Sequence, residues 1–592
     1  MASPWLIALV TTLLVALAGI YVSYQRDTPA SYLRKTTAEL RTDYDYVIAG
    51  GGTAGCVLAA RLSEDSDSTV LLLEAGGSEL EDSLTRWLTR LPTLTPSLML
   101  LPHLSWQYRT VPQAQAAYGF TNKQIAWPAG RMLGGSSATN YMLYTRGLST
   151  TYDAWAAGGA TGWSYADVKP FFEKVEQVIE LTPTSATYFQ TLTDAFLAAG
   201  KFLQRSYSNG RASIGDFYQL SSAMVDGKRW HAGIGYLFPA LNRPNLHVMT
   251  HAHVTKVNID GKRATGVSFQ TQSGEEAVVM ATKDVIVSMG AVGSPTLLML
   301  SGIGPRAHLQ SLGIEVIADL PVGQNLQDHL FVPVRVTLNT SVSFTEAKVT
   351  TVSELLKYAL LGTGMLTESV GMPAAGSVKL GDESTAELFL YLLNIGSTSR
   401  LYQLISGLSE EAWRRFAPGI YDPSAEGCFI APTLVYAHAR GNITLASRDP
   451  FQFPSINPQY LNNDHDVEVL IQGIRLAIKM AMTQPFQALG ATYHIPDFHL
   501  CAHHPADTDA LYGCIVKHIA MTMYHYAGTC KMGRSSDPAT VVDPQLRVKG
   551  ISGLRVVDAS VMPAISGGNT MAPTLMLAEK TAVDIRQQHR SR

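Results

Sequence analysis

The sequence DYVIAGGGTAG, residues Asp45–Gly55, decides the fold of the first part of this chain. Its first five residues, Asp45–Ala49, form a short apolar run typical of a buried strand, and the pattern G-x-G-x-x-G follows at once. Gly50 allows a tight turn, Gly52 lets a pyrophosphate approach the backbone, and Gly55 lets the next helix pack closely on the strand. The stretch therefore predicts a strand, a phosphate-binding turn and a helix.

A helix and a second strand complete this unit. Cys56–Leu62 has small and apolar side chains suited to packing on a sheet, and the positive end of such a helix would face a bound anion. Thr69–Leu73 is a second apolar run that ends in Glu74, where the ribose hydroxyls of an adenine dinucleotide are expected. A carboxylate there would repel a 2′-phosphate. The unit thus predicts a dinucleotide such as NAD or FAD and leaves both open.

The chain is long, apolar and nearly neutral. It has 592 residues, of which 46% are hydrophobic and 16% charged, so it exceeds what one core usually organises and we expect two domains. A formal net charge of -3 gives no sign of the basic surface that nucleic acids require, so no nucleic-acid partner is expected. The five cysteines are scattered and odd in number, which predicts at least one thiol unpaired within the chain and no disulfide framework.

The amino terminus carries an uncharged apolar segment, Trp5–Val22. Its length lies at about the 18-residue threshold for a membrane span, and Ala16–Ala18 offers a small-residue cleavage pattern, so a cleaved signal and an uncleaved anchor both stay open. We expect residues 1–42 to be this targeting segment with a linker, and the chain to enter the secretory pathway as a secreted or membrane-anchored protein. The triplets at Asn339 and Asn442 would then be candidate glycan acceptors.

Five further segments carry a resemblance to a known family. Gly130–Asn140, which reads GRMLGGSSATN, resembles the first signature of the glucose-methanol-choline oxidoreductases, and Gly290–Gly304 looks like the second. Three more segments are similar to family segments in the family's order, namely Gly323–His329, Tyr524–Gly533 and Arg555–Ser560. The likeness runs from about Asp43 to Ile585, so it covers nearly the whole chain.

The resemblance implies a cofactor and a domain plan. It implies FAD rather than NAD, bound by an α/β Rossmann-like domain of the glutathione-reductase type, with a discontinuous α+β substrate-binding domain built over it. We expect residues 43–160, 230–335 and 520–590 to form the FAD-binding domain, and residues 161–229 and 336–519 to form the substrate-binding domain.

Oxidising an alcohol requires a group that removes the hydroxyl proton while the carbon gives up a hydride, and a neutral imidazole suits that task near neutral pH. The resemblance places His525 at the family's catalytic histidine and Asn569 at its second active-site position, where an amide can hold the substrate oxygen. Hydride would pass to flavin N5. Thr574–Ile585, which follows Pro573, is interpreted as a helix whose positive end would face the flavin and stabilise its reduced form.

The cofactor-binding residues follow from the first motif and from the resemblance. They are Gly50, Gly52, Thr53, Ala54, Gly55, Glu74, Ala75, Arg131, Gly134, Gly135, Ser136, Asn140, Met142, Leu143, Val254, Ala291, Asp558, Ala559, Asn569 and Thr570. Thr139 stands where choline oxidases carry a histidine bonded to the flavin, so the FAD is predicted to be non-covalent. The densest group of potential metal ligands, His499, Cys501, His503 and His504, matches no standard zinc spacing, and no metal site is expected.

The resemblance favours oxidation of a CH–OH group of an alcohol or sugar, with oxygen or a quinone-like carrier as electron acceptor and a dehydrogenase favoured. Alternatives are an enzyme like the fatty acid photodecarboxylases or the hydroxynitrile lyases of the family, or a catalytically silent FAD-bound interaction protein. His525 and Asn569 argue against the photoenzyme and the silent protein. The substrate stays open among sugars, aliphatic or aromatic alcohols and sterols, and substrate-domain aromatics such as Tyr391 and Trp413 are interpreted as packing residues.

Overall fold

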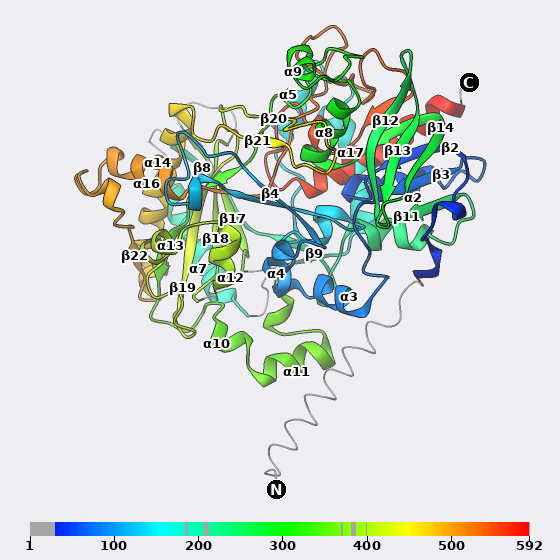
Figure 1. The fold of residues 1–592 in the computed structure, drawn as a ribbon. Coiled ribbons are helices and arrows are strands. Elements are labelled where there is room, and N and C mark those ends of the chain that lie inside the picture. The colour runs from blue at the N-terminus through cyan, green and yellow to red at the C-terminus, as the bar shows by residue number, and fades with distance from the viewer. Residues whose placement is uncertain are drawn as a thin grey trace.

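The computed structural model describes residues 30–183, 188–206, 212–368, 371–380, 386–397 and 400–590. The apolar segment Trp5–Val22, predicted to be a signal or an anchor, lies outside these ranges. Within them, no helix combines the length and the apolar character that a membrane crossing requires. The described chain is organised around two large sheets, one in each half of the molecule (Figure 1).

The first sheet is built on the unit that the sequence predicts. β2 (Asp43–Ala49) and β3 (Val70–Leu73) are parallel neighbours, and α2 (Thr53–Leu62) connects them. Every residue of β3 is buried, as expected for a central parallel strand covered on both faces. The sheet order is β1-β11-β3-β2-β14-β13-β12, with β24 paired to β14. The other strands are β1 (Leu33–Arg34), β11 (Leu246–Met249), β12 (Ala252–Asp260), β13 (Arg263–Thr271), β14 (Glu276–Val287) and β24 (Leu554–Val556).

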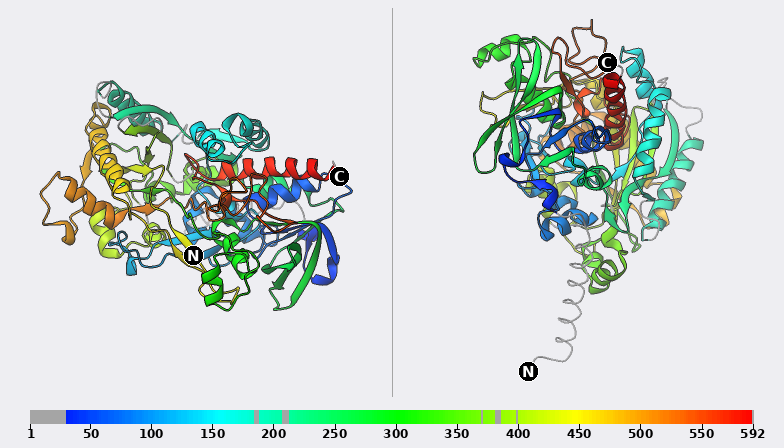
Figure 2. Two further views of the ribbon diagram at one scale, coloured as in Figure 1. Left: turned by 90° about the horizontal axis from the view of Figure 1, so that it is seen from above. Right: turned by 90° about the vertical axis from the view of Figure 1, so that its right-hand side faces the viewer.

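Two helices from opposite ends of the chain pack together on this sheet. α17 (Met571–Arg590) lies alongside α2, as the left view in Figure 2 shows. The pair is tied by an ion pair in which Arg61 Nη2 lies 2.7 Å from Glu579 Oε1. Pro573 occupies the first turn of α17, which confirms the helix predicted there. This packing brings the N-termini of both helices to the same region of the molecule.

The second sheet is antiparallel and has the order β22-β16-β19-β18-β17-β8. Its strands are β8 (Ala212–Gln219), β16 (Val334–Thr337), β17 (Ala374–Leu380), β18 (Leu388–Leu393), β19 (Gly427–Leu434) and β22 (Thr492–His494). α14 (Asp464–Ala481) and α7 (Gln190–Ser206) pack on one face of it. The other face looks toward the first domain and contributes to the cavity described below.

The two domains share strands where they meet. β15 (Leu330–Phe331) and β23 (Met521–Thr522) lie in segments that the sequence assigns to the FAD-binding domain, yet they pair with each other, and β15 also pairs with β19 of the second sheet. These two short strands therefore extend the second sheet, although their segments are predicted to belong to the FAD-binding domain. The reason is local, since β23 leads directly into the loop that carries His525, and that loop must lie between the domains.

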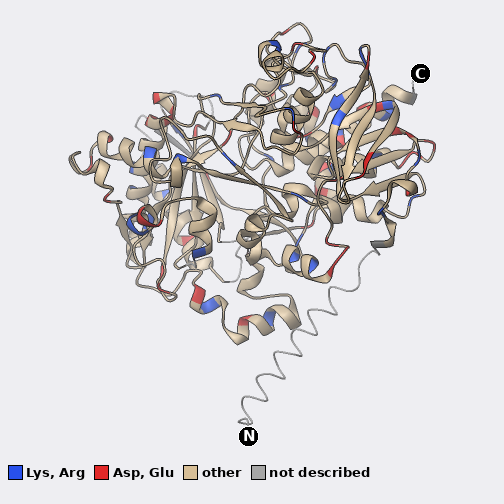
Figure 3. Cartoon of the chain, in the orientation of Figure 1, with Lys and Arg blue, Asp and Glu red and all other residues tan. Residues whose placement is uncertain are grey.

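Smaller elements complete the described chain. The remaining helices are α3 (Ser83–Arg90), α4 (Thr95–Leu100), α5 (Ser149–Ala157), α6 (Tyr165–Val178), α8 (Gly290–Leu300), α9 (Arg306–Ser311), α10 (Glu346–Val349), α11 (Val352–Leu361), α12 (Arg400–Ser406), α13 (Glu410–Phe416), α15 (Gln484–Gln487) and α16 (Asp509–Ile519). The remaining strands are β4 (Ser105–Arg109), β5 (Ala126–Gly130), β6 (Leu143–Tyr144), β7 (Leu181–Pro183), β9 (Ser221–Val225), β10 (Lys228–Arg229), β20 (Asn442–Thr444) and β21 (Ser455–Asn457). Basic and acidic residues are interspersed over these elements (Figure 3).

The cysteines form one disulfide, between Cys501 and Cys514. Cys56, Cys428 and Cys530 are free and buried. The sequence predicts unpaired cysteines, but it does not predict this bridge, because pairing depends on the positions of η9 (His499–Cys501) and α16 in space.

Candidate active site

A cavity of about 820 Å³ lies between the two sheets and is lined by residues of both domains. It extends from the turn between β2 and α2 to the inner face of β18 and β19. His525 and Asn569, the predicted catalytic pair, both lie on its wall. A single cavity therefore connects the predicted dinucleotide site with the predicted site of chemistry.

The turn between β2 and α2 forms one end of the cavity. Gly50 has a φ of 101°, and a Cβ atom there would lie 2.6 Å from the carbonyl oxygen of Ser288, so only glycine fits. A Cβ on Gly55 would lie 1.9 Å from the carbonyl oxygen of Gly50, which shows how closely the helix approaches the turn. Thr53 and Ala54 begin α2 and line the cavity, so the free N–H groups of its first turn suit a phosphate.

Glu74 lies on the cavity wall at the end of β3 and is 7% exposed. Its Oε2 accepts a hydrogen bond from the Gly51 amide and its Oε1 accepts one from the Gly76 amide, each at 2.8 Å. Burial raises the pKa of this carboxyl above its usual value, and the two amide hydrogen bonds and the charge of Arg131 oppose the rise. The carboxylate is thus fixed in place as an acceptor for ribose hydroxyls.

Asp558 holds the middle of the cavity wall together. Its Oδ2 accepts hydrogen bonds from the Gly290 amide at 2.9 Å and from Ser294 Oγ at 2.5 Å, and its Oδ1 accepts one from the Ser560 amide. Burial raises the pKa of Asp558. These bonds fix the start of α8 beside β24, so Asp558 organises this part of the cavity wall.

The residues fit an anionic dinucleotide. The first turns of α2 and α17 both contribute lining residues, and each presents backbone N–H groups with a positive dipole end. Arg131 lines the same space, stacks over Trp106 at 4.5 Å, and has a buried Nε without a hydrogen-bond partner. The buried Oδ1 of Asn569 also lacks a partner. Unpaired polar atoms of this kind are uncommon inside proteins and are explained by a bound polar group.

Most predicted cofactor residues line the cavity. Those on its wall are Gly50, Gly52, Thr53, Ala54, Glu74, Ala75, Arg131, Gly135, Ser136, Asn140, Met142, Leu143, Val254, Ala291, Asp558, Ala559, Asn569 and Thr570. Gly55 and Gly134 are not among the lining residues. Gly55 provides the close helix packing, and a Cβ on Gly134, whose φ is 95°, would lie 2.5 Å from His231 Nδ1.

The catalytic pair comes together across the cavity. His525 follows β23, and Asn569 immediately precedes the first residues of α17. His525 Nε2 lies 3.2 Å from Asn569 Nδ2, although the two residues are far apart in the chain. Burial, and then the neighbouring His329, lower the pKa of His525 well below its usual value. The imidazole is therefore neutral near pH 7 and can accept a proton.

A buried carboxylate supports the loop of His525. Asp328 Oδ1 accepts hydrogen bonds from the backbone amides of His525 and His329, both at 2.9 Å. Its Oδ2 accepts hydrogen bonds from the hydroxyls of Thr522 and Tyr460 at 2.5 Å. Burial raises the pKa of Asp328 to about 6, against these hydrogen bonds. The sequence motif Gly323–His329 contains Asp328, but the motif alone does not reveal this function.

A second histidine fixes the tautomer of the first. His329 Nδ1 lies 2.9 Å from His525 Nδ1. The pKa of His329 is lowered to about 4, because burial outweighs the backbone carbonyls of Val435 and Ser566 that raise it, so both rings are neutral. Since Asn569 Nδ2 donates to His525 Nε2, the single proton of His525 lies on Nδ1 and is donated to His329. The lone pair of His525 Nε2 accepts from Asn569 in this structure, and a substrate hydroxyl that displaces this hydrogen bond would donate its proton to the same lone pair.

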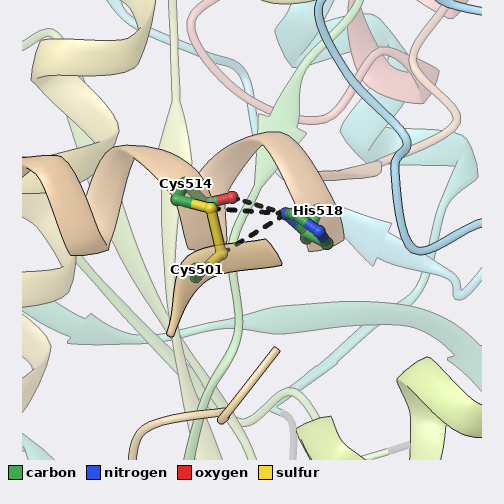
Figure 4. A group of neighbouring side chains, drawn as sticks. All are labelled: Cys501, Cys514 and His518. Carbon is green, nitrogen blue, oxygen red and sulfur yellow. Dashed lines mark hydrogen bonds between the residues drawn. A yellow bond between two sulfur atoms is a disulfide. The ribbon is translucent and has the colours of Figure 1, made fainter. Parts of the chain in front are cut away.

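The histidine and cysteine cluster noted in the sequence has another explanation. Cys501 forms the disulfide with Cys514, and His518 Nδ1 lies 3.6 Å and 3.8 Å from their sulfur atoms (Figure 4). His518 Nδ1 also makes a 2.8 Å hydrogen bond with the carbonyl oxygen of Cys514. A disulfide offers no thiolate to a metal. This group, which lies on η9 and α16, is not among the lining residues of the cavity.

Together these features define an enzyme class. A Rossmann-type unit, a cavity suited to an anionic dinucleotide and an imidazole–amide pair facing it define a dinucleotide-dependent oxidoreductase. The family can also be stated, because two models described as GMC oxidoreductase match residues 44–331 and 437–578. The chain belongs to the GMC, or glucose-methanol-choline, oxidoreductase family.

Known proteins similar to this chain are spread across organisms. The chain is 33% identical to the glucose dehydrogenase [FAD, quinone] of Drosophila pseudoobscura pseudoobscura over 96% of its own length and 91% of that protein. It is 34% identical to the mitochondrial choline dehydrogenase of Homo sapiens over 97% of its own length and 95% of that protein. Among solved structures, pyridoxine 4-oxidase from Mesorbium loti has a TM-score of 0.74 at 25% identity, covering 93% of this chain and 99% of that one.

These comparisons confirm several sequence predictions. The family, the FAD-binding fold with a separate substrate-binding domain, and FAD as the cofactor are all confirmed. The protein is a GMC-type oxidoreductase that oxidises the CH–OH group of an alcohol or sugar.

Proposed function

We propose that His525 removes the hydroxyl proton of the alcohol through Nε2, that Asn569 holds the alcohol oxygen, and that a quinone-like carrier takes the electrons. The contact of 3.2 Å between His525 Nε2 and Asn569 Nδ2 on the cavity wall carries this proposal. It supplies a proton acceptor and a hydrogen-bond donor that can meet at a single oxygen atom.

The chain controls the proton of this reaction. A substrate hydroxyl that faces both side chains would replace their direct hydrogen bond, donate to His525 Nε2 and accept from Asn569 Nδ2. As the proton moves to Nε2, the Nδ1–H of His525 keeps its hydrogen bond to His329, so the ring stays oriented. FAD, when bound, accepts at N5 the hydride that leaves the carbinol carbon. The substrate thus loses one proton and one hydride and becomes a carbonyl compound.

The start of α17 favours the reduced state of the cofactor. Asn569, Thr570 and Met571 line the cavity at the N-terminus of this 20-residue helix. The positive end of its dipole stabilises negative charge placed there. Thr139 is buried directly after the short 3-10 helix Gly135–Ala138. A threonine cannot form a histidyl–flavin bond, so we propose non-covalent FAD.

The identity of the electron acceptor distinguishes a dehydrogenase from an oxidase. A relative named glucose dehydrogenase [FAD, quinone] supports a quinone-like carrier, and oxygen is the alternative. The test is anaerobic reduction of the yellow holoenzyme by alcohols, followed by mixing with air or with a soluble benzoquinone. Fast reoxidation by the quinone and slow reoxidation by air are expected. Fast recovery in air alone would make the enzyme an oxidase and contradict the proposed acceptor.

We also propose that the chain enters the secretory pathway, as a secreted or membrane-anchored protein. The disulfide between Cys501 and Cys514 supports this proposal, because such bonds persist in oxidising compartments. Asn339 is exposed and begins an N-x-S/T triplet. Expression in a eukaryotic host should give a glycan that Asn339→Gln removes, and sequencing the mature N-terminus decides between cleavage and anchoring. A full-length, unglycosylated protein in the cytosol would contradict the proposal.

A further inference from the structure

The inner face of the second sheet forms the part of the cavity that faces the catalytic pair. Side chains alternate along a strand, so Tyr391 and Leu393 of β18 lie on the same face, opposite Ala431 and Phe429 of β19. All four line the cavity. The intervening leucines of β18 belong to the large core on the side where α14 packs. β15 contributes Phe331 beside Met521 of β23, two strands that end at the loop of His525.

Two short helices close this part of the cavity. Ile405 of α12 is 4% exposed and Trp413 of α13 is 5% exposed, and both line the cavity. Together with the sheet residues they make a chamber of aromatic and aliphatic side chains. We call the space bounded by Phe331, Tyr391, Leu393, Ile405, Trp413 and Phe429 the apolar chamber.

Charge is distributed unevenly around the cavity. Of the described lining residues, those with a carboxylate or guanidinium group are Glu74, Arg131 and Asp558. All three belong to the first domain and to the wall that suits the dinucleotide. In the apolar chamber the polar side-chain groups are the phenol of Tyr391, whose pKa burial raises so that it stays neutral, and the indole N–H of Trp413.

We propose that the chamber selects an uncharged alcohol with a bulky hydrocarbon group, and that neither a sugar nor a quaternary ammonium alcohol is the preferred substrate. This inference rests on the proposed function of His525 and Asn569. A sugar would bury several hydroxyls with few partners, and unpaired buried polar groups are costly. Aromatic rings attract a quaternary ammonium group, but the lining carboxylates Glu74 and Asp558 belong to the dinucleotide wall, so no negative charge accompanies these rings to offset the loss of hydration.

The inference can be tested with two pairs of alcohols, in which the members share a similar framework and differ in charge or in the number of hydroxyl groups. Choline and 3,3-dimethylbutan-1-ol differ in one atom, nitrogen or carbon, and thus in charge. Glucose and cyclohexylmethanol both carry a hydroxymethyl group on a six-membered ring. For the wild-type holoenzyme, kcat/KM of anaerobic flavin reduction should be at least about 100-fold higher for the neutral or apolar member of each pair.

Equal or faster reduction by choline or glucose would overturn the inference while leaving the proposed chemistry intact. Failure of every alcohol to bleach the flavin would instead overturn the proposed function. The two failures are therefore distinguishable in one experiment.

Adjacent residues of α12 provide a matched pair of variants. Ile405 faces the chamber, whereas Leu404 is 56% exposed. Ile405→Ala should lower kcat/KM for cyclohexylmethanol about 10-fold or more and change that for ethanol little, because ethanol does not reach this wall. Leu404→Ala should match the wild type with both alcohols. An unchanged Ile405→Ala variant with a normal flavin spectrum would remove this wall from substrate recognition.

Discussion

His329 provides the sharpest perturbation of the catalytic site. Replacing it by phenylalanine keeps a ring in a position that is 3% exposed and removes the acceptor for His525 Nδ1–H at 2.9 Å. His329 Nε2 has no hydrogen bond of standard geometry, and the change also removes the ring from the backbone carbonyls of Val435 and Ser566. The backbone of His525 stays anchored to Asp328. The fold should therefore be kept while the Nδ1–H of His525 loses its acceptor.

The expected decrease in the rate of flavin reduction can be estimated from comparable substitutions. Orienting partners of a functional histidine are worth roughly 10–100-fold, and the wrong tautomer in a serine protease triad costs about 10⁴-fold. We expect flavin reduction to slow about 100-fold, or roughly 2.7 kcal/mol of transition-state stabilisation. Loss of one net hydrogen bond should cost only about 1 kcal/mol of folding stability.

The assay is stopped-flow anaerobic reduction of the flavin across pH. Because His329 lowers the pKa of His525, its removal should shift the acid limb of the rate profile to higher pH. His329→Asn, whose Oδ1 can accept from His525 Nδ1–H, should recover most of the lost rate. A phenylalanine variant with a wild-type rate and pH profile would refute the tautomer argument.

Three other changes test separate parts of the structure. His525→Ala should keep the flavin bound and slow its reduction by about 10²–10⁴-fold, measured in the same stopped-flow assay. The pKa of Asp328 is raised to about 6, so its contribution favours the folded state below pH ~4 and is lost as pH rises through 6. Relative to Asp328→Asn, the wild type should thus lose roughly 3 kcal/mol of stability between pH ~4 and ~7 in denaturant titrations, and a gain would contradict the assignment. Cys514→Ser opens the disulfide loop and should cost up to about 3 kcal/mol, and a reductant should lower the melting temperature of the wild type but not that of the variant.

Much of the dinucleotide-binding half is predictable from the sequence because its determinants are local. Asp45–Gly55 and Glu74 lie within one short unit, and backbone geometry dictates which residue types fit there. His525 and Asn569 follow from the family resemblance, and the structure places them 3.2 Å apart.

The contacts that hold the catalytic residues in position cannot be predicted from the sequence in the same way. His329 and His525 are 196 residues apart, and their contact exists only once β15 and β23 pair. Asp328 and His329 at the end of the motif Gly323–His329 indicate a functional site, yet the sequence does not indicate which groups these two side chains contact. The strand residues that line the apolar chamber show the ordinary alternation of a strand in the sequence. Only the order and register of the sheet show which face of the strands lines the cavity.

The most direct test of the central claim is anaerobic reduction of the wild-type holoenzyme by benzyl alcohol and by its α-dideuterated form, with His525→Ala beside it. Bleaching of the flavin, a slower rate with the deuterated alcohol, and loss of most of the rate in the variant are predicted. Absence of bleaching with any alcohol, or equal rates in wild type and variant, would contradict the account of His525 and Asn569 as the site of alcohol oxidation.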